Sequence, residues 1–121
     1  MSYSVTITED FAKSAKRLSK KYKSLKNDLA SLIEELKENP YLGDRISRKV
    51  YKIRLAIKSK GRGKSGGARV ITYVSVEIEN KKEGDTIVTY LLEIYDKSEI
   101  SNIPKDVVDA YEKAAAKLEE E

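Results

Sequence analysis

Apolar and polar residues alternate with a period of two at the start of the chain and then change to a helical period. The alternation from Tyr3 to Ile7 predicts a short strand. Thr8 follows as a helix cap, and Glu9 and Asp10 fall in the first turn, where the helix dipole favours acids. The apolar positions of this helix are Phe11, Ala15, Leu18 and Tyr22.

A second helical pattern begins after Ser24, which we expect to cap it. Its apolar positions are Leu25, Leu29, Leu32, Ile33 and Leu36. Asn39-Pro40 ends the pattern because the residue before a proline is biased away from helical geometry. A turn over residues 22–24 joins the two helices into a helical hairpin.

The second half of the chain is strand-like. Residues 50–57 alternate, which places Tyr51, Ile53, Leu55 and Ile57 on one side and Lys52, Arg54 and Lys58 on the other. Residues 68–78 and 86–95 predict two more strands, joined by a polar turn over residues 80–85 that contains Gly84. Pro104 opens a last amphipathic helix over residues 105–120.

These elements predict one α+β domain over residues 1–121, in the order β-α-α-β-β-β-α. Local hairpins make the last three strands antiparallel, so we expect a small, twisted antiparallel sheet with an N-terminal helical hairpin and a C-terminal helix. We expect all of the helices to cover one face of that sheet.

Composition removes several classes of chemistry. The chain has no cysteine and no histidine, which excludes disulfides, thiolate nucleophiles, histidine-based triads and the usual zinc sites. No apolar run has the length of a membrane span, and the N-terminus lacks a signal-peptide pattern. We therefore expect a cytoplasmic protein that does not bind a membrane.

The net charge of +4 hides a strong asymmetry along the chain. Residues 45–76 hold ten cations and no acid, whereas the remaining residues hold 14 cations and 20 acids. Such a block indicates a polyanionic partner such as a nucleic acid. The alternative interpretation is a solvated basic hairpin.

Within this block lies the glycine-rich segment SKGRGKSGGAR, residues 59–69. Gly63-Lys64-Ser65 copies the end of a nucleotide-binding P-loop, but Lys58 stands where that motif needs its first glycine, and a strand rather than a helix follows. We interpret the segment instead as a basic connection between two strands whose backbone can approach a phosphate chain closely.

The strongest sign of chemistry is a set of cations on neighbouring strands. Lys52, Arg54 and Lys58 share one side of their strand, and Arg69 opens the next strand. Unpaired like charges on adjacent strands repel, so a purely structural sheet rarely keeps them. The structural alternative is that acids such as Glu93 and Asp96 neutralise them.

The segments YKIRLAIKSKGRGKSGGARVITYV and VTYLLEIYDKSEISNI resemble the bacterial RelE/ParE toxin superfamily, and most closely its RelE-like and HigB-like branch. The most specific pieces are K-I-R-L, G-K-S-G-G-A-R-V and I-Y-D-K-S-E, and the similarity covers almost the whole chain. The resemblance implies the RelE-like fold and an mRNA interferase, which cuts messenger RNA in the ribosomal decoding site. It also implies an antitoxin that covers the basic face.

The resemblance assigns four catalytic positions: Lys52, Arg54, Arg69 and Lys97. Several relatives carry a tyrosine a few residues further on, but Ile103 stands at about that position here. Tyr95 could take over its stacking role. The expected RNA-binding set is Arg45, Arg48, Lys58, Lys60, Arg62, Lys64 and Tyr95.

A mechanism without histidine needs a lysine as the base on the RNA 2′-hydroxyl. We assign that role to Lys52, since crowding by neighbouring cations favours a neutral amine. Arg54 and Arg69 would grip the phosphate, and Lys97 would supply the proton to the leaving 5′-oxygen. We expect neither a cofactor nor a metal, because the basic block contains no acids.

The expected partners are the ribosome with its messenger RNA and a cognate antitoxin, and the free toxin is expected to be a monomer. Two rivals stay open. A ParE-like protein shares the fold but inhibits DNA gyrase, and it generally lacks the basic catalytic set. A plain RNA-binding module would use the basic loop without cutting.

Overall fold

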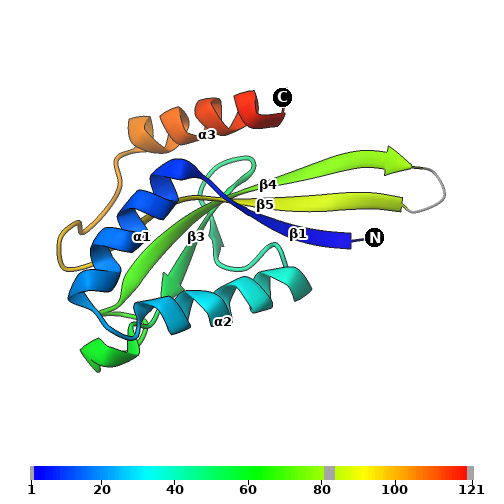
Figure 1. The fold of residues 1–121 in the computed structure, drawn as a ribbon. Helices are drawn as coiled ribbons and strands as arrows, with labels where there is room; N and C mark the ends of the chain where they lie inside the picture. The colour runs from blue at the N-terminus through cyan, green and yellow to red at the C-terminus, as the bar shows by residue number, and fades with distance from the viewer. Residues whose placement is uncertain (1, 81–83, 120–121) are drawn as a thin grey trace.

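Three helices and a five-stranded mixed sheet form the α+β fold of the described residues, 2–80 and 84–119 of a computed structural model (Figure 1). The elements run β1 (Ser2–Ile7), α1 (Glu9–Lys21), α2 (Leu25–Glu38), β2 (Asp44–Arg45), β3 (Val50–Leu55), a 3-10 turn η1 (Lys58–Lys60), β4 (Ala68–Asn80), β5 (Gly84–Asp96) and α3 (Lys105–Glu119). Residues 81–83 of the predicted turn and Glu120 of the predicted last helix lie outside the described residues.

The two N-terminal helices begin differently. Thr8 caps α1 as predicted, because its hydroxyl accepts a hydrogen bond from Phe11 N at 3.3 Å. The same hydroxyl donates to the carbonyl oxygen of Leu91 at 2.7 Å, which fixes the helix start to β5. Ser24 occupies the N-cap position of α2 as predicted, but its hydroxyl makes no cap bond and donates instead to a carboxylate oxygen of Asp28 at 2.8 Å.

The strand order is β1-β5-β4-β3-β2. The neighbours among β2, β3, β4 and β5 pair antiparallel, as predicted for the hairpins. The expectation of a wholly antiparallel sheet is wrong, because β1 pairs parallel to β5, from Ser2 opposite Thr86 to Ile7 opposite Leu91. The two-residue strand β2 was not predicted, and β3 ends at Leu55 rather than at Ile57.

The helices cover both faces of the sheet and not one (Figure 1). A first buried cluster packs α1 and α2 against Ile53, Leu55, Ala68 and Val70. A second buried cluster packs Val108 and Ala115 of α3 against the opposite face. The members of the second cluster on the sheet are Val50, Ile71, Tyr73, Val88, Tyr90, Leu92 and Tyr95. The prediction of helices on one face only is therefore wrong.

Polar contacts hold the C-terminal half of α3 above the hairpin of β2 and β3. The Ser47 hydroxyl donates to the Glu112 carboxylate, and the Lys49 ammonium lies 3.2 Å from that of Glu119. Burial raises the pKa of Glu119, but hydrogen bonds from Tyr73 and Lys49 outweigh it and leave the pKa below its usual range. Since α3 is fixed at this end, it covers the part of the face around Tyr73.

Two buried threonines on β4 and β5 lead to a stability prediction. The hydroxyls of Thr72 and Thr89 are fully buried and find no hydrogen-bond partner in the described part of the chain. A buried polar group without a partner costs about 1–3 kcal/mol. We expect Thr72→Val, which keeps the shape, to raise the free energy of unfolding by about 1 kcal/mol, measured by urea denaturation.

Thr8→Val is the matched control, since it makes the same chemical change where the hydroxyl has two partners. We expect it to lower the free energy of unfolding by about 1–2 kcal/mol. If Thr72→Val were as destabilising as Thr8→Val, the Thr72 hydroxyl would have a partner, such as a bound water.

Candidate nucleic-acid interface

The predicted catalytic cations of β3 and β4 lie on one face of the sheet. Arg54 is directly opposite Arg69 in the β3–β4 register, and Arg69 is directly opposite Tyr95 in the β4–β5 register. Directly opposed residues of antiparallel strands have Cα atoms about 4.5–5.5 Å apart. Lys52 follows on the same face, two residues from Arg54 along β3. Arg54 is exposed, Lys52 is half-buried, and Arg69 is only 4% exposed.

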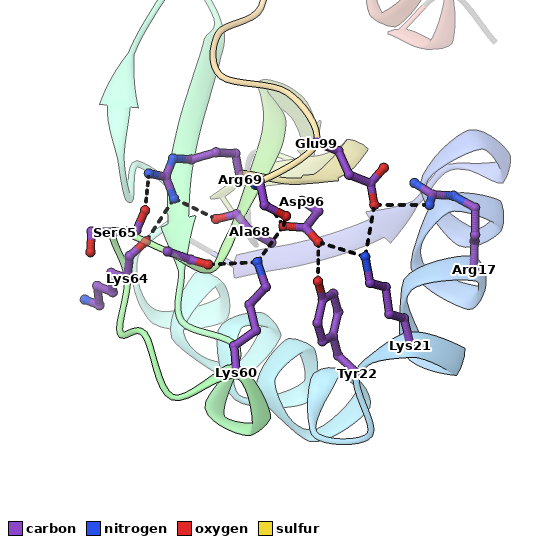
Figure 2. A network of polar contacts seen from close by, with 12 residues as sticks. Arg17, Lys21, Tyr22, Lys60, Lys64, Ser65, Ala68, Arg69, Asp96 and Glu99 are labelled. Carbon is purple, nitrogen blue, oxygen red and sulfur yellow. Dashed lines mark hydrogen bonds and ion pairs between the residues drawn. The ribbon is translucent and has the colours of Figure 1, made fainter.

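Backbone carbonyls, not carboxylates, hold the buried guanidinium of Arg69 (Figure 2). Nη1 donates to the carbonyl oxygens of Lys64 at 2.9 Å and Ala68 at 3.1 Å, and Nη2 donates to that of Ser65 at 3.3 Å. These carbonyls satisfy the N–H groups but carry no formal charge. The positive charge of Arg69 is therefore fixed in place without being neutralised.

Glu93 and Asp96, the acids that we considered as neutralising partners, bind other groups, whereas Asp44 stands directly opposite Lys52 in the β2–β3 register. None of the ion pairs within residues 2–80 and 84–119 includes Lys52, Arg54, Arg69 or Lys97. Glu93 accepts a hydrogen bond from the backbone N–H of Ile94 at 2.9 Å. The ammonium of Lys97 donates to the carbonyl oxygen of Ser101.

Tyr95 lies beside the cations but offers no open ring face. Its side chain is 4% exposed and belongs to the second buried cluster, against which Ile103 also packs. Burial raises the pKa of Tyr95, while the charge of Arg69 pulls that pKa partly back, so the guanidinium lies near the phenol. In this arrangement the Tyr95 ring cannot stack on a base.

The local backbone geometry explains the glycines at positions 61, 63 and 67 of the loop. Gly61 and Gly63 have φ values of +71° and +63°, which favour glycine. A Cβ on Gly67 would lie 2.0 Å from the carbonyl oxygen of Leu55, because the backbones of β3 and β4 approach each other closely there. The glycines therefore shape the connection between the strands, with no need for a phosphate.

The remaining cations that we expected to bind RNA divide into two groups. Lys58, Arg62 and Lys64 are exposed in or next to the glycine-rich segment of residues 59–69, which we call the glycine loop. Arg45 and Arg48 are exposed at the other end of β3, where the Arg45 Nε donates to the carbonyl oxygens of Ser47 at 3.3 Å and Arg48 at 3.2 Å. The basic block thus forms a strip along the length of β3.

Lys60 differs from the other loop cations because it points inward. Its side chain is 10% exposed, and its ammonium lies 2.6 Å from Asp96 and 2.9 Å from the carbonyl oxygen of Gly66. We expected Lys60 among the surface cations, because its partner acid, Asp96, is 36 residues away along the chain. No local pattern signals this pair.

An open groove of about 730 Å³ runs beside the strip, between α2 and the edge of β3 that β2 leaves uncovered. Its basic lining is Lys52, Arg54, Lys58 and Lys64, and its acidic lining is Asp28, Glu35 and Asp44. The acidic wall was not anticipated, because its members come from α2 and from β2. Asp44 stands directly opposite Lys52 in the β2–β3 register, whereas Asp28 and Glu35 come from α2. The α2 carboxylates would repel a polyanion, so we expect it to follow β3 on the side away from α2.

The described residues contain neither a cluster of metal ligands nor a membrane-spanning helix. No three acidic side chains gather there closely enough to hold a metal ion. None of the helices there combines the length and the apolar character needed to cross a bilayer. The basic strip with its groove is the candidate site.

No known protein family has a profile that matches the chain, and no solved structure matches it significantly. The RelE-like interpretation therefore depends on the sequence motifs and on the placement of the cations.

Proposed function

We propose that this protein is a RelE-like toxin of a type II toxin–antitoxin system, an endoribonuclease that cuts messenger RNA on the ribosome. One observation carries the nuclease proposal. Arg54 and Arg69 lie directly opposite each other, and no carboxylate within the described residues binds either one. Directly opposed like charges destabilise a sheet, so a bound polyanion is the natural reason to keep them. Ribosome dependence and the antitoxin partner come from the sequence resemblance alone.

The proposed reaction is an attack of the RNA 2′-hydroxyl on the adjacent phosphorus. Lys52 takes the hydroxyl proton, the new O–P bond forms, and the bond to the 5′-oxygen breaks. Lys97 gives a proton to that 5′-oxygen, which leaves a cyclic phosphate and a free 5′-hydroxyl. Arg54, being exposed, binds the phosphate directly, and the fixed charge of Arg69 beside it stabilises the transition state.

Arg54→Ala tests this proposal better than a change at Arg69, because the exposed Arg54 holds no part of the loop. We expect roughly 100- to 1,000-fold slower cleavage, since the lost donor acts on charge that develops in the transition state. The measurement is primer extension on an mRNA translated by purified ribosomes. Lys37→Ala, which removes an exposed cation on α2, is the control and should cleave normally.

A plain RNA-binding module is the second candidate, and the burial of Tyr95 favours it, because its ring is closed to the base that a nuclease would have to position. Salt-dependent RNA binding without any cuts would establish that class and contradict the nuclease. Cleaved DNA accumulating with gyrase would instead place the protein with the ParE-like inhibitors.

A further inference from the structure

The carboxylate of Asp96, at the end of β5, is fully buried and joins three parts of the chain (Figure 2). Its Oδ1 accepts hydrogen bonds from the Lys60 ammonium at 2.6 Å and from the backbone N–H and hydroxyl of Ser98 at 3.0 and 2.8 Å. Its Oδ2 accepts from the Tyr22 hydroxyl at 2.5 Å. Asp96 therefore links the end of α1 and the start of the glycine loop to the end of β5.

Lys60 extends this link across the glycine loop. Its ammonium also donates to the carbonyl oxygen of Gly66 at 2.9 Å, and it lies 5.1 Å from the centre of the Tyr22 ring. One buried charge thus ties residue 60, near the start of the loop, to residue 66, near its end. The loop is closed by a side chain, not by its backbone alone.

The hydrogen bond between Lys60 and Gly66 holds the part of the loop that orients the Arg69 guanidinium. Two of its three carbonyl partners belong to Lys64 and Ser65, which immediately precede Gly66. If Gly66 were released from Lys60, those carbonyls would be free to turn away. A fixed loop is therefore a condition for a fixed Arg69.

We infer that Lys60 and Asp96 are positioning residues for the proposed RNA-cleaving face. They hold the glycine loop so that its carbonyls aim Arg69, and neither residue touches the RNA. Buried ion pairs are often no more stabilising than apolar packing of the same volume. The buried pair of Lys60 and Asp96 is therefore better explained by its role in fixing the geometry of the loop. The consequence for cleavage depends on the proposed function, but the consequence for Arg69 does not.

The first measurement follows Arg69 directly, by the exchange of its guanidinium protons with water in NMR spectra. We expect Lys60→Met to speed this exchange by about tenfold or more, as the loss of a net hydrogen bond predicts. Tyr22→Phe is the control, because it removes one hydrogen bond to Asp96 but leaves the tie between Lys60 and Gly66. It should lower stability without changing the exchange of Arg69. If Lys60→Met does not fold, Lys60→Gln, which loses the charge but keeps a donor, takes its place.

The second measurement is cleavage at saturating RNA. We expect Lys60→Met to cleave roughly 10- to 100-fold more slowly through kcat, as for a misplaced catalytic group, and Tyr22→Phe to keep its rate. Unchanged Arg69 exchange in folded Lys60→Met would overturn the inference, as would equal effects of the two substitutions. An unaltered protein that fails to cleave would overturn the proposed function only, because the exchange measurement still decides the role of Lys60.

Discussion

Gly67→Ala is expected to lower the free energy of unfolding by about 3 kcal/mol, the upper end of what overpacking usually costs. The added Cβ would lie 2.0 Å from the carbonyl oxygen of Leu55 and 3.0 Å from Ala56 Cα and Ile57 N. All three atoms are backbone, so no side chain can turn aside. Relief requires β3 to separate from β4 at the residues next to Arg54 and Arg69.

Gly61→Ala provides the matched control in the same loop. Gly61 has a φ of +71°, but a Cβ there meets nothing within 4 Å. Only the left-handed backbone is penalised, which costs roughly 1–2 kcal/mol. Urea denaturation of both variants measures the difference. Equal losses would mean that the backbones of β3 and β4 are further apart in solution than in this structure.

Asp96→Ala is expected to cost about 3–5 kcal/mol, a large fraction of the stability of a small domain. The substitution leaves the 10%-exposed Lys60 ammonium without its carboxylate and the Tyr22 hydroxyl without its acceptor. The control is Glu99→Ala, which breaks exposed ion pairs to Arg17 and Lys21. It should change stability by less than about 1 kcal/mol. A similar loss in both variants would contradict a buried charge network.

The pH dependence gives an independent check on Asp96. Burial raises its pKa, but hydrogen bonds from Lys60, Tyr22 and Ser98 outweigh burial and hold the pKa well below its usual range. The stabilisation is therefore present above the pKa of an unfolded aspartate, about 3.9, and is lost as the pH falls below it. The difference in unfolding free energy between the unaltered protein and Asp96→Ala should shrink below about pH 4. A constant difference down to pH 2 would argue against the network.

Local patterns predicted the elements of this fold well, because helical and strand periods are properties of neighbouring residues. We did not predict that α3 covers the face opposite α1 and α2, although the sequence contains a pattern that indicates it. Residues 70–76 and 87–92 are almost continuously apolar, which indicates strands buried on both faces. The pairing of β1 with β5 and the strand β2 carry no such signal, since they depend on contacts between distant or very short segments.

The parts of the candidate site that depend on neighbouring residues were also predictable from the sequence. Alternation along β3 correctly placed Lys52 and Arg54 on one face, and the register put Arg69 beside them. The same expectation for Lys58 is wrong, because Lys58 lies in η1, beyond the end of β3. The inward turn of Lys60 and the acidic wall of the groove were not predictable, because both depend on residues brought in from α2, β2 and the end of β5.

The parallel pairing of β1 with β5 also bears on the order in which the chain matures during synthesis. β1 can pair only after Thr86, some 84 residues further along the chain from its partner Ser2, and the residues that follow Thr86 have emerged from the ribosome. Long-range pairing of this kind forms slowly. Until β5 emerges, β1 has no partner strand. A nascent chain therefore lacks the complete sheet until β5 has been translated.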